Sequence, residues 1–165
     1  MKSLTAILAS IIMITSSAKC DDGDAATPES VARAALACLK SGDYPRFQKL
    51  CVSRQDLIEF IEAVIASGEL TERQIESRKK LLENIDAFHK SLVGEQKEVF
   101  ESSLEREDWS KIEEKGLEKK ARVEDGIEMH RVEMELSNGK LLVVDDIVKL
   151  SSGFRIFEDA PVRIK

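Results

Sequence analysis

Apolar side chains occupy every second position through most of the stretch from Ile127 to Glu158. Two glycine-containing turn signals, Asn138-Gly139 and the segment 151–153, divide it into three segments. Alternation interrupted by such turns is typical of antiparallel strands that bury one face. The residues upstream have helical spacing. We therefore expect an α+β fold, in which N-terminal helices pack on a curved C-terminal antiparallel sheet of three to four strands.

The first of these turns can close in two ways, and the choice decides which side chains share a face. A two-residue loop would pair Leu136 with Leu141, whereas a three-residue loop with Gly139 in the left-handed conformation pairs Leu136 with Lys140. Only the three-residue loop gathers the apolar residues of both strands on one side, so the pattern predicts that register. The residues gathered in this way are Val132, Met134, Leu136, Leu142, Val144, Val148 and Leu150.

Continued to the next turn, the same register places three polar side chains in one row across the apolar face. His130 would face Asp146, and Asp146 would face Glu158. A histidine beside a carboxylate on an apolar wall is a candidate general base, because the neighbouring charge raises its basicity. The row is also what the solvated end of a sheet would show. We favour this second interpretation, because the sequence contains no supporting catalytic signal.

Residues 1–18 resemble a secretory signal peptide. Lys2 precedes an apolar run, and small residues lead to a predicted cleavage after Ala18. The run is shorter than the about 20 residues that a transmembrane helix needs. The sequence thus predicts an exported protein, periplasmic or secreted, with an acidic flexible tether at residues 19–27 and a single α+β domain at residues 28–165.

The three cysteines leave alternatives open. Cys20, followed by a polar tether, is similar to the lipidated cysteine of bacterial lipoproteins, although Lys19 stands where those signals carry a small residue. Ordinary secretion is the default, and membrane attachment is expected only if Cys20 is lipidated. Cys38 and Cys51 are candidates for a disulfide, which would contribute about 3 kcal/mol in an exported protein. Two buried thiols would explain the same pair equally well.

Several helix starts precede the strands. Thr27, Ser53 and Thr71 are predicted N-caps, each followed by apolar residues at helical spacing. The helix after Thr71 has a narrow apolar stripe in a charged background, and Gly94 is expected to kink or divide it. Residues 109–126 are predicted to add a linker, a first strand and a hairpin turn.

The formal net charge is −6, with acidic and basic residues interleaved. Nucleic acid is not expected as a partner, because binding phosphates requires a basic face. The chain contains no sequence motif for nucleotide, redox, hydrolase or metalloprotease chemistry, so no cofactor and no metal are expected. His89 lies in a charged helical stretch and is interpreted as a solvated helix residue.

The order of the predicted elements is similar to one known pattern. Two segments contribute to the similarity: Leu39-Lys-Ser-Gly-Asp-Tyr44 after the first helix, and Lys149-Leu-Ser-Ser-Gly-Phe154 near the end. It resembles the nuclear transport factor two-like superfamily, which has a cystatin-like cone fold and includes exported bacterial members of unknown function. The resemblance covers about residues 28–159 and implies a cone-shaped pocket between sheet and helices. Some members are isomerases, dehydratases or cyclases, and many others bind ligands or partner proteins. The segment 71–108 is longer than that pattern, which leaves the helix count open.

Two functions follow as expectations. The leading one is an exported, non-enzymatic domain that binds a small ligand or a partner protein in or beside an apolar pocket. The alternative is a cofactor-free lyase or isomerase with His130 as base and Asp146 orienting it. A homodimer packed through the outer sheet face is a third reading, although alternating charges at residues 131–135 argue against a large hydrophobic interface there. Both pocket functions fail if three aromatic side chains fill the cone: Phe60, Phe88 and Phe100.

Overall fold

The computed structural model describes residues 25–157 and 162–165. The proposed signal peptide, Cys20, most of the proposed tether and Glu158 lie outside these residues. What the sequence predicts for them therefore stays a prediction.

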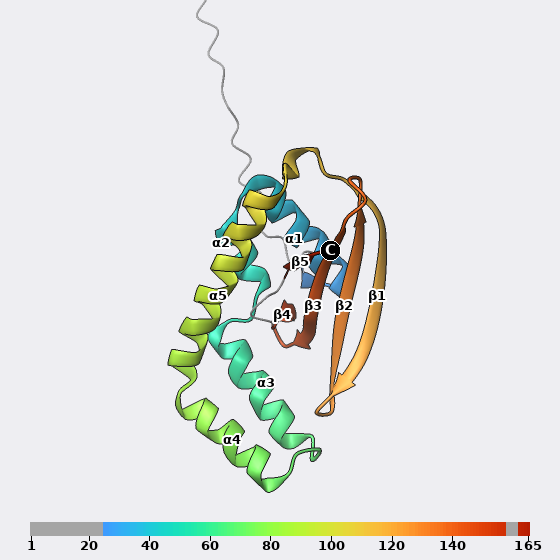
Figure 1. Cartoon of the computed structure of the whole chain (residues 1–165). Helices are drawn as coiled ribbons and strands as arrows, with labels where there is room; N and C mark the ends of the chain where they lie inside the picture. Colours follow the sequence, from blue (N-terminus) through green and yellow to red (C-terminus); the bar gives the residue numbers. More distant parts are fainter. Residues whose placement is uncertain (1–24, 158–161) are drawn as a thin grey trace, which may run out of the picture.

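The N-terminal part of the described chain is helical and the C-terminal part forms the sheet (Figure 1). A short 3₁₀ helix, η2 (Trp109–Lys111), links the two. The α-helices are α1 (Pro28–Ser41), α2 (Tyr44–Leu50), α3 (Arg54–Ala66), α4 (Glu72–Glu83) and α5 (Ile85–Arg106).

The three predicted N-caps are confirmed. The hydroxyl of Thr27 accepts a hydrogen bond from the backbone N–H of Ser30, which begins α1. Ser53 and Thr71 cap α3 and α4 in the same way, and at each start the third helical residue bonds back to the cap. Such capping boxes satisfy backbone donors that the first turn leaves without partners, and so they fix where each helix begins.

The segment after Thr71 divides at Asn84 rather than at Gly94, so the predicted site of the break was wrong. Asn84 leaves the helical conformation, with φ −111° and ψ 21°, and its side chain donates to the carbonyl of Lys80 at 2.9 Å. Gly94 lies inside α5. An asparagine side chain competes for backbone partners, whereas a glycine only lowers helix propensity, which explains the position of the break.

The strands form one five-stranded antiparallel sheet in the order β1-β2-β3-β4, with β5 paired to β3. The α+β class, with N-terminal helices against a C-terminal antiparallel sheet, is confirmed, and β5 is a strand that the sequence pattern did not reveal. The strands are β1 (Glu114–Glu124), β2 (Ile127–Leu136), β3 (Leu141–Leu150), β4 (Gly153–Ile156) and β5 (Val162–Ile164).

The predicted three-residue loop between β2 and β3 is confirmed. The N–H of Leu136 donates to the carbonyl of Lys140 at 2.9 Å, and Gly139 is left-handed with φ 80°. The β1–β2 hairpin also turns where predicted, at Asp125 and Gly126, whose φ values are 50° and 75°. Two successive positive φ values give the tight turn whose twist matches the flanking strands.

A β-bulge in β3 overturns the predicted register beyond the middle of the sheet. Val132 pairs with Val144 as expected, but His130 pairs with Ile147 rather than with Asp146. Three residue steps along β3 therefore match two along β2, and Asp146 takes a left-handed φ of 48°. Such an extra residue exchanges the faces of the side chains that follow it.

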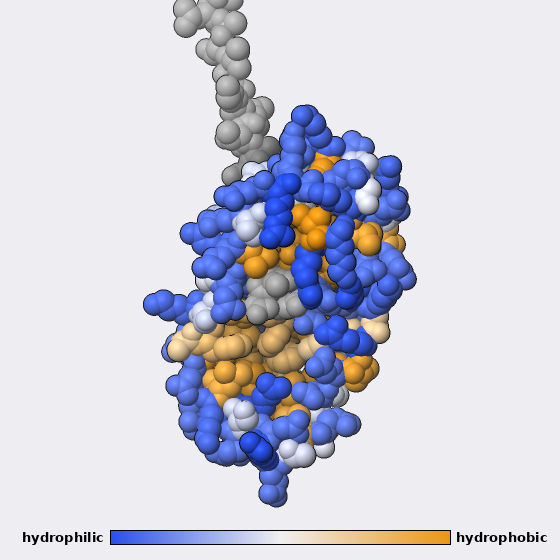
Figure 2. All heavy atoms as spheres, viewed as in Figure 1, coloured by the Kyte–Doolittle hydropathy of each residue, from blue (hydrophilic) through white to orange (hydrophobic). Residues whose placement is uncertain are grey.

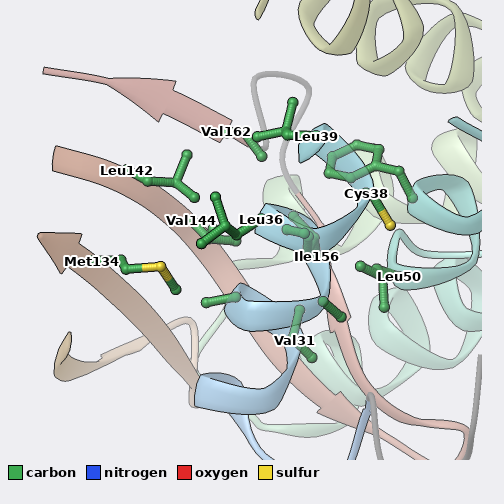
Figure 3. Packing of buried hydrophobic residues seen from close by; sticks show 14 of the residues in the cluster. Val31, Leu36, Cys38, Leu39, Leu50, Met134, Leu142, Val144, Ile156 and Val162 are labelled. Carbon is green, nitrogen blue, oxygen red and sulfur yellow. The ribbon is translucent and has the colours of Figure 1, made fainter. Parts of the chain in front are cut away.

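The exchange distributes the apolar residues of β3 over two cores. The first core lies between the sheet and α1, α2, η2 and the later part of α5; Figure 3 shows Met134, Leu142 and Val144 packed there. Ile147 joins it, whereas Val148 and Leu150, predicted for that same face, lie in a second core with α3. One continuous apolar face was therefore a wrong prediction.

The second core is less completely covered than the first. Figure 2 shows apolar side chains gathered in the lower half of the face in view, where Figure 1 places α3. Several members of this core are only partly buried, among them Ile58, Ile65 and Phe88. The rest of that face is mostly hydrophilic, as the interleaved charges of the sequence require.

Candidate functional site: a cleft beside the sheet

The row of His130, Asp146 and Glu158 does not form as predicted. The bulge separates His130 from Asp146, and Glu158 lies outside the described residues. The side chain of His130 is 11 % exposed and packs edge-on to Phe154, with ring centroids 5.6 Å apart. Among the described residues its Nδ1 atom has no hydrogen-bond partner. The nearest described carboxylate, that of the exposed Glu128, lies 3.8 Å from the Nε2 atom, which is longer than a hydrogen bond. No hydrogen-bonded carboxylate among the described residues therefore orients His130 as a general base would require.

Asp146 instead pairs with Arg122 on the outer face of the sheet. Burial raises the pKa of the Asp146 carboxyl above its ordinary value, Arg122 acts in the opposite direction, and the charge of Asp145 raises it further. Asp145 is buried and accepts from Arg122, Arg131 and Arg163 at 3.2–3.3 Å. Through these three arginines, the Asp145 carboxylate links β3 to β1, β2 and β5 electrostatically.

Cys38 and Cys51 are both buried thiols of the first core, not a disulfide. Burial raises the pKa of the Cys51 thiol, and the nearby Cys38 adds to the rise. A thiol held in its protonated form is a poor nucleophile and a poor metal ligand. The structure therefore gives these two residues a packing role.

The space between sheet and helices is filled by side chains. Val132, Met134, Leu136, Leu142 and Val144 are fully buried there. Phe100 packs among them with its ring centroid 4.8 Å from that of Phe47. The filled interior therefore leaves no room for a ligand on this face of the sheet.

A cleft of about 1000 Å³ lies beside that filled interior, where three helices and two strands meet. Ligand pockets in proteins commonly measure about 300–1,000 Å³, so its size suits a small organic molecule. The walls come from α2, α3, α5, the end of β3 and β4, together with Ala25 and Ala26 ahead of α1. Its lining side chains with polar or charged ends are Gln48, Lys49, Ser53, Asp56, His89, Lys149, Ser151, Ser152 and Arg155.

Two sets of contacts fix the walls of the cleft. At its base, the N–H of Val52 donates to the carbonyl of Ile156 at 3.0 Å, which ties the α2–α3 connection to β4. The hydroxyl of Tyr44 donates to the carbonyl of Val93 at 3.1 Å, which sets the spacing of α2 and α5. Because direct hydrogen bonds join these separate elements, the cleft is largely formed before any ligand enters.

Asp56 links α3 to the turn between β3 and β4. Its carboxylate accepts from the N–H of Ser53 at 2.9 Å and from the hydroxyl of Ser152 at 2.5 Å, and it lies 4.0 Å from Arg155. Burial alone would raise the pKa of this carboxyl, but these hydrogen bonds and the charge of Arg155 outweigh it and lower the pKa. The ionised side chain therefore stabilises the wall near the start of α3.

Sequence reasoning missed this cleft. His89, interpreted as a solvated residue, is half-buried and lines the cleft from α5. Lys49 comes from α2, and Lys149 and Arg155 come from the β3–β4 hairpin about 100 residues later in the chain. No spacing rule connects them, because only the tertiary packing of α2, α5 and the β3–β4 hairpin brings them together.

Comparisons with known protein families, curated proteins and solved structures found no match for this chain. The resemblance to the nuclear transport factor two-like superfamily thus remains a prediction.

Within residues 25–157 and 162–165, no group of three or more His, Cys, Asp or Glu side chains is arranged to hold a metal ion. None of the helices in this part of the chain is both long enough and apolar enough to cross a bilayer.

Proposed function

We propose that the protein is an exported, non-enzymatic domain that binds a small organic ligand in the cleft between α2, α3, α5 and the β3–β4 hairpin. The observation that carries the proposal is the cleft itself. It has the volume of a ligand site, and direct hydrogen bonds between separate elements hold its walls. The export part of the proposal rests on the signal-like residues 1–18.

Binding is preferred over catalysis because, among the described residues, no carboxylate is hydrogen-bonded to His130; Glu128 lies 3.8 Å from its Nε2 atom. Asp146, the group proposed to orient it, is committed to Arg122. In the cleft, the one lining carboxylate, Asp56, is buried and fully hydrogen-bonded. A general acid or base needs a group that is accessible to substrate and ready to exchange a proton.

A screen of small organic molecules against the isotope-labelled protein tests this proposal. Binders should shift backbone amide resonances of residues 48–53 and 149–155 in two-dimensional NMR spectra. Resonances of the outer β1–β2 hairpin should stay in place and serve as the internal control. The proposal fails if binders shift the hairpin resonances instead, or if no compound shifts the cleft resonances at millimolar concentration.

A further inference from the structure

We infer that the ligand of this cleft is a small organic anion, with an apolar body and one carboxylate or phosphate group held between Lys49 and Lys149. The inference rests on the proposed function, because it names the class of ligand for the same cleft. Three observations carry it: the charge of the lining, the partners that this charge already has, and the apolar surface beside it.

The lining is cationic in a chain of net charge −6. Three lining side chains carry a positive charge, those of Lys49, Lys149 and Arg155, and Asp56 alone carries a negative one, which gives a formal charge of 3 − 1 = +2. A concave surface of one sign raises the local concentration of ligands of the opposite sign. The cleft therefore selects against cations and favours anions.

Arg155 does not account for the excess positive charge of the cleft lining. Its guanidinium donates to the backbone carbonyls of Ser152 at 2.6 Å and Phe154 at 2.9 Å, and its charge lies beside Asp56. These partners leave it few donors and a neutralised charge. The excess positive charge of the cleft thus resides on the two lysines.

Both lysines are available to a ligand. Lys49 and Lys149 are exposed, and neither has an ion-pair partner among the residues that the structure describes. The ammonium of Lys149 lies 6.0 Å from the centroid of the Phe154 ring, at the outer limit of a cation–π contact, and both residues line the cleft. An ammonium group has three donors and binds carboxylate or phosphate as a point charge.

The remaining lining supplies an apolar contact surface. Pro45 is exposed, and Val93 and Phe154 are half-buried, so each presents apolar atoms to the cleft. Small-molecule sites typically combine such surfaces with a few polar groups that fix orientation. An inorganic anion would leave this surface unused, whereas an amphiphilic organic anion would cover it.

Calorimetric titration of the processed protein with hexanoate, hexyl phosphate and neutral hexanamide tests the inference. At least one anion should bind about tenfold more tightly than the amide, and its affinity should fall as salt is added. Which of the two anions binds distinguishes carboxylate from phosphate as the recognised group.

Lys49→Gln combined with Lys149→Gln should weaken anion binding about tenfold without changing the melting temperature, because both side chains are exposed. Lys115→Gln is the matched control, since this exposed lysine of β1 is outside the cleft. Equal affinity for amide and anions would overturn the anion inference and leave the proposed binding function intact. If none of the three binds, and the NMR screen also finds no cleft binder, both fail together.

Discussion

Asp145 and Asp146 are neighbours in the chain, yet we expect their contributions to stability to differ in size. Asp145 is buried with three arginines around it, so Asp145→Asn should lower the free energy of unfolding by about 2 kcal/mol, because these arginines lose their shared counter-charge. Asp146→Asn should change it by less than about 0.5 kcal/mol. Asparagine accepts the left-handed φ of 48°, and a neutral side chain avoids the desolvation that raises the Asp146 pKa.

Urea unfolding of both variants at pH 7 measures this difference. Similar losses in the two variants would contradict the distinct roles assigned to the pair. The wild-type protein and Glu118→Gln, an exposed change on β1, provide the reference values.

Because of Asp56, the free energy of unfolding should fall as the solution becomes acidic. Its pKa is lower in the folded protein than its ordinary value of about 3.9, so its contribution is complete above that value and is lost as pH falls through the folded pKa. Asp56→Asn should therefore lower the free energy of unfolding by about 1–2 kcal/mol at pH 7, because hydrogen bonds to a charged acceptor are lost. In denaturant titrations, the difference in free energy of unfolding between the wild-type protein and Asp56→Asn should be smaller at pH 3 than at pH 7. An equal difference at both pH values would contradict the role assigned to Asp56.

Among the helices, two glycines provide a matched test of backbone conformation. Gly42 ends α1 with φ 66°, whereas Gly94 lies within α5, and a Cβ atom would meet no neighbour within 4 Å at either position. Gly42→Ala should destabilise the protein by about 1 kcal/mol through the left-handed conformation alone. Gly94→Ala should stabilise it by about 0.5–1 kcal/mol. Thermal unfolding measures the melting temperatures of both variants. Shifts of the same sign would contradict a left-handed conformation at Gly42 and a helical one at Gly94.

The sequence predicted some elements correctly and others not, and the difference has physical reasons. Caps and tight turns depend on residues a few positions apart, so Thr27, Ser53 and the Asn138-Gly139 loop were predictable. The bulge at Asp146 was not, because an aspartate in the left-handed conformation is paired there with Arg122 of β1, which β2 separates from β3. One inserted residue then moved Val148 to the other core.

For the complete protein, the site was harder to predict than the fold. Apolar alternation and helical spacing are repeated along many residues, so errors at single positions do not change the fold class. The cleft depends instead on single side chains from α2, α5 and β3, such as Lys49, His89 and Lys149, each of which is unremarkable in its own segment. Their convergence follows from tertiary packing, which local patterns do not encode.

Export predicts a defined N-terminus for the mature chain. Intact-mass and peptide analysis of protein recovered from a bacterial periplasm should find cleavage after Ala18, so that the chain begins at Lys19. A diacylglyceryl adduct on Cys20 would replace simple secretion by membrane attachment. A full-length chain that stays in the cytoplasm would contradict export. Ala25 lines the cleft, so attachment at Cys20 would hold the binding site close to the bilayer.

A crystal structure of the protein with the tightest compound from the NMR screen tests the binding site most directly. The compound should lie between α2, α5 and the β3–β4 hairpin, with its anionic group near Lys49 and Lys149 and its apolar part against Val93 and Phe154. A compound found instead within the filled core between α1 and the sheet, or at the arginines around Asp145, would contradict the assignment of the cleft as the ligand site.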